Sequence, residues 1–191
     1  MKKLKEILFK VNIDSVYGNT EINVSKITFD SREVENSSLF VAIAGHNYDG
    51  HDYINQSIKN GASVVVCEKL PVNFKESNIV FICVTCSKTA LSIIASNFFD
   101  NPSSKIDLIG ITGTNGKTTI SSLLNNLFNE LKVKSGLIST INIKYGEFLE
   151  NSNNTTPDPI TINFHLSEMI KSKIKVCFIE VSSHGIFQKR V

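Results

Sequence analysis

The sequence has little net charge and no long apolar run. Its 191 residues carry 20 Lys and Arg against 18 Asp and Glu, which gives a formal net charge of +2. That balance gives no support for a nucleic-acid or membrane surface. A membrane-spanning helix needs about 20 consecutive apolar residues, and no stretch of this sequence approaches that length. We therefore expect neither nucleic acid nor a membrane among the partners.

The beginning of the sequence does not have the pattern of a secretory signal. Residues 1–10 have a basic head, but their apolar run is short and charged residues flank it on both sides. A signal peptide has an uninterrupted apolar region of about 7–15 residues. We expect an amphipathic first helix here and a cytoplasmic location for the protein.

Cysteine is scarce. Of the four cysteines, Cys83 and Cys86 have the spacing of a metal or redox pair, but the sequence offers no second pair and no neighbouring histidine to complete a zinc site. Cys67, Cys83 and Cys177 each lie in a strand-like apolar run. We expect all four to be reduced thiols, mostly buried.

The most informative stretch is glycine-rich. Residues 110–119 read Gly-Ile-Thr-Gly-Thr-Asn-Gly-Lys-Thr-Thr. The apolar residues 106–111 predict a buried strand, and the leucine spacing in residues 120–131 predicts a helix that follows it. We expect one face of this helix to point inward, and that face consists of Leu123, Leu124, Leu127 and Leu131.

A strand, a glycine-rich turn and a helix form the context of a phosphate-binding loop. Backbone N–H groups beside glycines can surround phosphate oxygens, and the helix N-terminus adds partial positive charge. Lys117 supplies a full charge, and the Thr118 hydroxyl can ligate Mg²⁺. The general pattern places glycine at position 111, where this chain has Ile111, and Gly110 comes one residue early. The Gly-Lys-Thr core in this context still favours a phosphate loop over an ordinary turn.

The rest of the chain alternates between strand and helix patterns. Strands are predicted at residues 26–29, 38–43, 63–67, 79–84, 135–140, 142–149 and 174–181, the sixth turning at Gly146, and helices at residues 52–59, 87–99 and 159–171. Residues 101–104, Asn-Pro-Ser-Ser, mark a linker. We predict two α/β domains, residues 1–101 and 102–191, and in the second a mostly parallel, three-layer architecture.

Several polar stretches follow the expected strands. Taken alone, Asp30-Ser31-Arg32 and residues 45–50 are ordinary polar turns, and residues 154–159 are a loop with a helix start at Pro159. Glu180 lies near the end of a buried strand, where an isolated carboxylate is costly. A metal ion beside the phosphate loop removes that cost. His184 with Ser182 and Ser183 suggests a hydrolase triad, but no Gly-x-Ser-x-Gly elbow is present.

Together these stretches resemble the Mur ligase family. The phosphate loop resembles those of the Mur ligases and their folylpolyglutamate synthetase relatives. The ordered set resembles the first two-fifths of the MurE branch, the UDP-N-acetylmuramoyl-tripeptide synthetases, and covers essentially the whole chain. The set consists of residues 28–32, 39–42, 45–51, 110–119, 154–157 and 180–185, with Gln188 and Arg190.

The resemblance implies roles for individual residues. It implies an N-terminal domain that binds a UDP-sugar and a truncated, Rossmann-like P-loop domain that binds ATP. Lys117 and Glu180 are the implied catalytic residues, and Thr118 and Glu180 the implied ligands of Mg²⁺. The implied ATP-binding residues are Gly113, Thr114, Asn115, Gly116, Lys117, Thr118 and Thr119. Those implied for the UDP-sugar-peptide are Phe29, Ser31, His46, Asn47, Tyr48, Asn154, Thr155, Thr156, Ser182, Gln188 and Arg190.

The implied reaction is an ATP-dependent amide ligation. The family adds the third amino acid to UDP-N-acetylmuramoyl-L-alanyl-D-glutamate through an acyl phosphate, with ATP and Mg²⁺, so the nucleotide-sugar dipeptide and an amino acid are the implied partners. Family members also have a carbamylated lysine and a third domain that correspond to nothing in this sequence. The resemblance therefore implies a chain that is inactive alone.

Two alternatives remain open from the sequence. One is another superfamily member such as MurF or a folate enzyme, although folate enzymes lack this kind of first domain, and residues 180–184 favour the MurE branch over MurF. The other is a nucleotide- or UDP-sugar-binding module without catalysis. The sequence does not identify the amino acid that is added.

Overall fold

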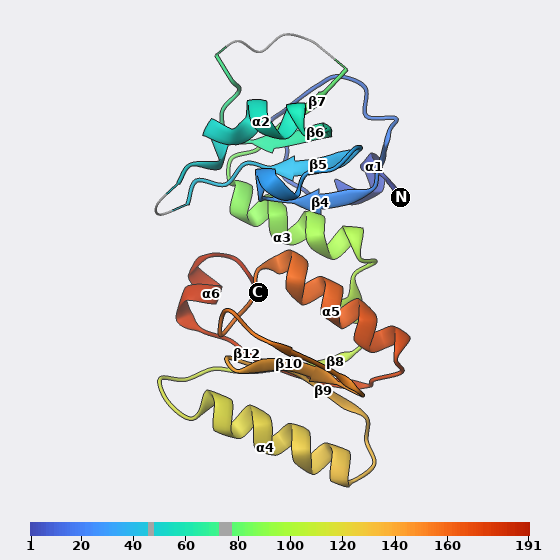
Figure 1. The fold of residues 1–191 in the computed structure, drawn as a ribbon, viewed down its shortest axis with the longest axis vertical. Helices are drawn as coiled ribbons and strands as arrows, with labels where there is room; N and C mark the ends of the chain where they lie inside the picture. The colour runs from blue at the N-terminus through green and yellow to red at the C-terminus, as the bar shows by residue number, and fades with distance from the viewer. Residues whose placement is uncertain (46–47, 73–77) are drawn as a thin grey trace. The chain divides into compact units, whose positions relative to one another are not determined.

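The computed structural model describes residues 1–45, 48–72 and 78–191. The described chain forms two compact units, Met1–Phe98 and Phe99–Val191, and each unit has its own five-stranded sheet (Figure 1). The boundary lies just before the Pro- and Ser-containing segment that the sequence marks as a linker. Because the two sheets share no strand, each unit is described by itself.

The first unit is built on a largely parallel sheet with the strand order β2-β7-β6-β5-β4. Strands β4 to β7 are parallel, and β2 joins β7 antiparallel. Helices α2 and α3 lie on opposite faces of this sheet (Figure 1). The elements are β1 (Lys2–Lys3), α1 (Leu4–Ile7), β2 (Ser15–Tyr17), β3 (Asn23–Val24), β4 (Lys26–Thr28), η1 (Ser31–Glu33), β5 (Ser38–Val41), η2 (Gly50–Tyr53), α2 (Ile54–Lys59), β6 (Ala62–Cys67), β7 (Val80–Cys83) and α3 (Ser87–Phe98).

The N-terminal segment differs from the amphipathic helix that the sequence predicts. Lys2 and Lys3 form strand β1, which pairs with β3, and only Leu4–Ile7 is helical. Leu4 and Ile7 are both fully buried, so burying these two apolar side chains needs only one helical turn. The short strands β2 and β3 carry too few apolar residues for periodicity to reveal them.

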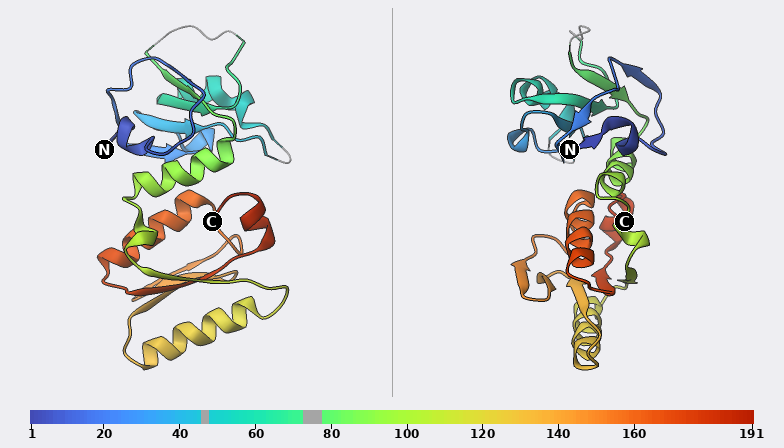
Figure 2. Two further views of the ribbon diagram at one scale, coloured as in Figure 1. Left: turned by 180° about the vertical axis from the view of Figure 1, so that it is seen from behind. Right: turned by 90° about the vertical axis from the view of Figure 1, so that its right-hand side faces the viewer.

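The second unit is a three-layer α/β structure, as predicted. Its sheet has the order β11-β10-β9-β12-β8, in which β8, β12 and β9 are parallel and the β10–β11 hairpin is antiparallel. Helices α4 and α5 cover opposite faces (Figures 1 and 2). The elements are η3 (Pro102–Ser104), β8 (Asp107–Ile111), α4 (Lys117–Glu130), β9 (Ser135–Ile138), β10 (Asn142–Tyr145), β11 (Phe148–Asn151), α5 (Pro159–Lys171), β12 (Val176–Glu180) and α6 (Ser183–Phe187).

Each face of this sheet has its own apolar core. On the α5 side, Leu166 and Met169 pack with Ile138 and Ile179. On the α4 side, Leu124 and Phe128 pack on strand residues that include Leu137 and Phe178, and the rings of Phe128 and Phe178 meet edge to face at 5.1 Å. The start of α5 is fixed by Asp158, which accepts hydrogen bonds from the N–H groups of Ile160 and Thr161.

Of the predicted inward face of α4, Leu124 packs on the sheet, and the other three leucines do not. Leu123 is 62% exposed, and Leu127 and Leu131 are exposed as well, whereas Ser121 and Asn125 are buried under the sheet. Polar contacts explain this rotation of the helix. The Ser121 hydroxyl reaches the Glu180 carboxylate at 3.4 Å, and the Ser135 hydroxyl donates to Asn125 Oδ1 at 3.1 Å.

Strand β8 is also less buried than the sequence predicts. It is the outer strand of the described sheet, and Leu108 and Ile109 are exposed there while Ile111 is buried. The apolar composition of this segment predicts its strand conformation correctly, but composition alone does not distinguish an edge strand from an inner one.

The four cysteines are free thiols. Cys67 and Cys177 are buried and Cys86 is exposed. Burial raises the pKa of Cys67 to about 12, which keeps this thiol protonated. In the described segments we find no helix with the length and apolar character needed to cross a membrane.

The two leucine environments of the second unit give a matched test of its packing. Leu137→Ala, at a side chain that is 1% exposed, is expected to destabilise the unit by about 2–5 kcal/mol, because it leaves a cavity in the α4-side core. Leu123→Ala on exposed α4 surface should change stability by no more than about 0.5 kcal/mol. Urea unfolding followed by circular dichroism measures both, and equal losses would contradict the observed rotation of α4.

His165 makes the stability of the second unit depend on pH. The side chain on α5 is 4% exposed, and its Nδ1 lies 3.3 Å from the Tyr145 hydroxyl. Burial lowers the pKa of His165 below its usual value, although Glu150 and Glu168 oppose this shift. The unfolded chain therefore binds a proton before the folded chain does as pH falls.

We accordingly expect the contribution of neutral His165 to be complete above about pH 6.5 and to be lost progressively below it. The urea midpoint of the second unit should fall between about pH 7 and pH 5. In His165→Phe, which keeps a ring but cannot titrate, that fall should be smaller. An unchanged pH dependence in His165→Phe would assign the effect to other groups.

Candidate functional site

The glycine-rich loop joins β8 to α4 with backbone angles that suit glycine. Gly113 has φ of 149° and Gly116 has φ of 80°, in the region where side chains are disfavoured. Gly116 is the N-cap of α4, and no side chain caps this helix end in the described structure. The first N–H groups of α4 therefore remain available to an anion, as phosphate binding at a helix start requires.

The Lys117 side chain folds back over this loop. Its Nζ donates to the Gly113 carbonyl at 2.6 Å and lies 3.5 Å from the Thr114 carbonyl. Both contacts are exposed, so phosphate oxygens can replace these carbonyls. The loop thus holds an ammonium group directly beside the free helix end.

Glu180 lies at the end of β12 and is fully buried. Its Oε2 accepts from the hydroxyls of Thr118 at 3.0 Å and Thr140 at 2.8 Å. Its Oε1 accepts from the Thr140 N–H at 3.1 Å and from the Ser121 hydroxyl at 3.4 Å. The parallel strands β8, β9 and β12 bring these groups together because their carboxyl ends meet at one edge of the sheet.

The surroundings of Glu180 fit a cation. Its hydrogen-bond donors are all neutral, and no ion pair between described residues includes it. In the same part of the chain no three His, Cys, Asp or Glu side chains form a metal-binding group. Mg²⁺ commonly binds through about one or two carboxylates together with phosphates and water. Glu180 and Thr118 beside the loop therefore suit Mg²⁺ held with a nucleotide.

The loop after β11 brings a second set of predicted residues together. The Thr156 hydroxyl donates to the Glu180 carbonyl at 2.9 Å and accepts from the Ser182 N–H at 2.9 Å. Arg190 Nη1 donates to the Thr156 carbonyl at 2.6 Å. Thr155 lies next to the Glu180 network, with its hydroxyl 3.2 Å from that of Thr140. This second set is therefore contiguous with the buried carboxylate.

Close packing reinforces this arrangement. A Cβ atom at Gly185 in α6 would lie 2.8 Å from Thr156 Cγ2, so only glycine fits there without displacing Thr156. The Ser182 hydroxyl accepts from the Gly185 N–H at 3.0 Å and caps α6. Asn154 is exposed and Gln188 half-buried.

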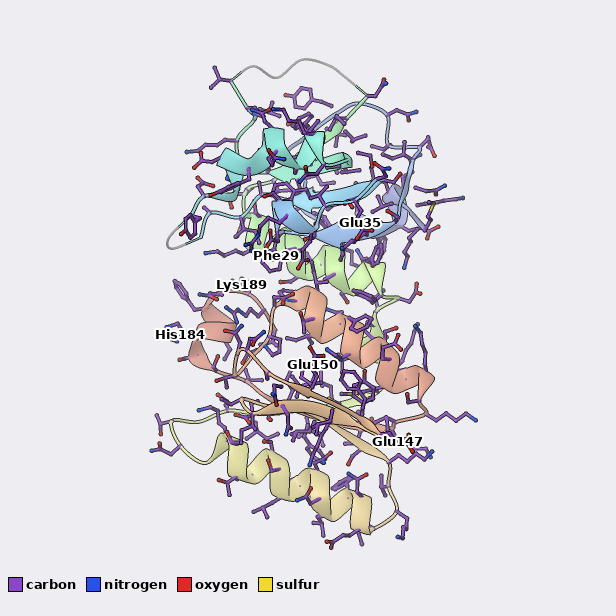
Figure 3. The ribbon with its side chains drawn as sticks, in the orientation of Figure 1. Phe29, Glu35, Glu147, Glu150, His184 and Lys189 are labelled. Carbon is purple, nitrogen blue, oxygen red and sulfur yellow. The ribbon has the colours of Figure 1, made fainter. Side chains whose placement is uncertain are left out.

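The predicted residues of the first unit follow two neighbouring parallel strands. Phe29 comes directly after β4 and is exposed (Figure 3). Ser31 begins η1, is largely buried, and its carbonyl accepts from Asn60 Nδ2 at 2.8 Å. Tyr48, after β5, is exposed. His46 and Asn47 lie outside the described residues.

The serine and histidine residues after β12 do not form a hydrolase site. His184 is exposed on α6 (Figure 3), and the Ser182 hydroxyl is used in capping that helix. These contacts agree with the absence of a nucleophile elbow from the sequence.

Sequence reasoning missed two members of the Glu180 network, Ser121 and Thr140. Ser121 lies in a helix that was oriented by its leucines, so its burial was not expected. Thr140 follows β9, and polar residues just after parallel strands gather at one sheet edge. That rule indicates Thr140, although the apolar pattern places it within the strand predicted over residues 135–140.

Two protein-family models match the chain. The model for the "Mur ligase family, catalytic domain" matches residues 23–102, and the model for the "Mur ligase middle domain" matches residues 111–191. Together they match most of both units and include all the predicted site residues.

Curated relatives agree with this match. UDP-N-acetylmuramoyl-L-alanyl-D-glutamate–2,6-diaminopimelate ligase of Cytophaga hutchinsonii is 45% identical over 189 residues, which are 99% of this chain and 39% of the relative. The enzyme of the same name from Bacteroides fragilis is 44% identical over 189 residues, with the same coverage. The chain thus spans about two-fifths of the length of these relatives.

Solved structures share the fold. A structure of a UDP-N-acetylmuramoyl-L-alanyl-D-glutamate–2,6-diaminopimelate ligase matches with a TM-score of 0.76 and 22% identity, over 100% of this chain and 38% of that one. MurF from Thermotoga maritima, in complex with ADP, matches with a TM-score of 0.55 and 24% identity, over 84% of this chain and 32% of that one. The two family models, supported by these relatives and folds, establish that the chain belongs to the Mur ligase family.

Proposed function

We propose that this chain supplies the nucleotide-sugar and ATP sites of an ATP-dependent ligase that adds the third amino acid to UDP-N-acetylmuramoyl-L-alanyl-D-glutamate in peptidoglycan synthesis. The names of the relatives favour 2,6-diaminopimelate as that amino acid. They also favour this reaction over that of MurF. A cytoplasmic location is part of the proposal, because ATP and the nucleotide sugar are cytoplasmic substrates.

The observation that carries the proposal is the buried Glu180 carboxylate beside the phosphate loop. Lys117 and the free start of α4 supply positive charge for the phosphates of ATP. Residues 113–119 surround those phosphates. Thr118 and Glu180 would hold Mg²⁺, which when bound neutralises charge on the transferring phosphoryl group.

The chemistry is a phosphoryl transfer followed by an acyl transfer. The D-glutamate carboxylate attacks the γ-phosphorus of ATP, so an acyl phosphate forms and ADP leaves. The amine of the incoming amino acid then attacks the acyl carbon, and inorganic phosphate leaves as the amide bond forms. Lys117 is placed to stabilise the charge that develops on the transferring group in the first step.

The substrate residues divide between the two units. We assign the uridine end of the nucleotide sugar to Phe29 and Ser31, together with His46, Asn47 and Tyr48. We assign the muramoyl-peptide to the loop after β11 and the segment around α6, and these residues are Asn154, Thr155, Thr156, Ser182, Gln188 and Arg190. The Thr156 contacts with Ser182 and Arg190 support this grouping.

The alternative is a module that binds nucleotides without catalysis. The chain spans 39% of its relatives' length, so we assign turnover to the whole ligase and binding to these residues. Phosphate release with the nucleotide-sugar dipeptide, ATP, Mg²⁺ and a panel of amino acids decides between the two functions. Release that requires both the dipeptide and one amino acid supports the ligase.

Lys117→Ala is expected to abolish ATP-dependent phosphate release in the full-length ligase. Removing a charge-assisted contact to the transferring phosphoryl group costs on the order of several kcal/mol in the transition state. Binding of the nucleotide-sugar dipeptide, measured by calorimetry in the same variant, should remain close to that of the unaltered protein. Unaltered turnover in Lys117→Ala would show that the loop does not bind the reacting phosphates.

Thr156→Val tests the organisation of the peptide loop. The change keeps the side-chain shape but leaves the half-buried Ser182 N–H and the buried Glu180 carbonyl without their hydroxyl partner. We expect a loss of about 1–3 kcal/mol in the unfolding free energy of the second unit. Thr156→Ser, which retains the hydroxyl, should lose less. A larger loss in the serine variant would mean that methyl packing outweighs the hydrogen bonds.

A further inference from the structure

Thr140 holds the buried carboxylate from two directions. Its N–H donates to Glu180 Oε1 at 3.1 Å, and its hydroxyl donates to Oε2 at 2.8 Å. Of the three described residues that donate to this carboxylate, Thr118 and Ser121 each reach one oxygen. Thr140 contacts both, so it fixes the rotation of the carboxylate group as well as its place.

The proton arrangement at Thr140 is determined by its neighbours. A threonine hydroxyl has one proton, and an ionised carboxylate only accepts. The Thr140 hydroxyl lies 2.8 Å from Glu180 Oε2 and 3.2 Å from the Thr155 hydroxyl. Its single proton therefore goes to the nearer acceptor, the carboxylate, and the contact with Thr155 is the weaker of the two.

Ser121 provides a contrast within the same network. Its hydroxyl lies 3.1 Å from the Thr118 carbonyl and 3.4 Å from Glu180 Oε1. Because its single proton has a nearer acceptor, Ser121 contributes less to the orientation of the carboxylate. Thr140 and Ser121 are thus a matched pair for mutagenesis, since both contact Glu180 and only Thr140 contacts both carboxylate oxygens.

We propose that Thr140 is a positioning residue that orients Glu180 for a divalent cation bound with nucleotide at the phosphate loop. The proposal rests on the cation site of the proposed function. It extends that site to Thr140, which follows β9, and connects it, through Thr155, with the loop assigned to the muramoyl-peptide. Thr140 itself acts through the carboxylate and touches no substrate.

The test measures cation binding rather than turnover. Mn²⁺ is titrated into the protein in the presence of ADP, and bound Mn²⁺ is followed by electron paramagnetic resonance. Metal-free ADP affinity is measured separately by calorimetry with a chelator present. Thr140→Val and Thr140→Ala both remove the hydroxyl. The valine keeps the side-chain volume but places a methyl group against the carboxylate, whereas the alanine removes the hydroxyl without replacing it. Either variant is informative if it folds.

We expect both hydroxyl-deleting variants to bind Mn²⁺ at least tenfold more weakly than the unaltered protein, with metal-free ADP affinity unchanged within threefold. Thr140→Ser, which retains both donors, should stay within threefold for Mn²⁺, and so should Ser121→Ala. A general loss of structure would weaken the binding of both Mn²⁺ and ADP, whereas the proposal predicts weaker binding of Mn²⁺ alone.

Three results would overturn the inference. They are unaltered Mn²⁺ affinity in Thr140→Val or Thr140→Ala, an equal loss in Thr140→Ser, and an equal loss in Ser121→Ala. The failure of both hydroxyl-deleting variants to fold, with Thr140→Ser folded, would also overturn it, because the hydroxyl would then serve the fold itself. An unaltered protein that binds ADP but no Mn²⁺ would instead refute the cation site of the proposed function.

Discussion

The second unit is organised around one buried carboxyl group, that of Glu180. Glu180 is fully buried, and a carboxylate in that position is costly unless its oxygens are satisfied and its charge is balanced. Neutral donors from α4 and from Thr140 satisfy the oxygens. Balancing the charge is left to a ligand. The same carboxylate therefore explains why Thr118 and Ser121 at the start of α4 face the sheet and why a phosphate loop lies beside it.

Much of this arrangement could be predicted from the sequence, because the local signals agreed. The order of strands and helices follows from apolar runs separated by Gly, Pro and polar turns, and Asp158 with Pro159 marks the start of α5. The phosphate loop could be recognised because a glycine-rich turn with Gly-Lys-Thr between a strand and a helix is typical of phosphate binding. Glu180 could be recognised because a carboxylate at the end of a buried strand is costly without a partner.

What could not be predicted depends on contacts between distant segments. The leucine spacing of α4 predicts the helix and the inward position of Leu124, but it misplaces the other three leucines. Ser121 and Asn125 are buried instead, by partners at positions 180 and 135. The position of Thr140 after a parallel strand indicates the sheet edge, but its partner could not be assigned, because Glu180 lies forty residues later in the chain. The exposure of Leu108 depends on the position of β8 at the sheet edge, which strand composition does not encode.

The central claim is that Glu180 is the metal-binding carboxylate of a nucleotide site. The most direct measurement is the affinity of the protein for ADP, with Mg²⁺ and with a chelator, before and after Glu180→Gln. The account predicts that Mg²⁺ tightens ADP binding to the unaltered protein and that this tightening disappears in Glu180→Gln, while metal-free binding persists. Tightening by Mg²⁺ that survives in Glu180→Gln would contradict it.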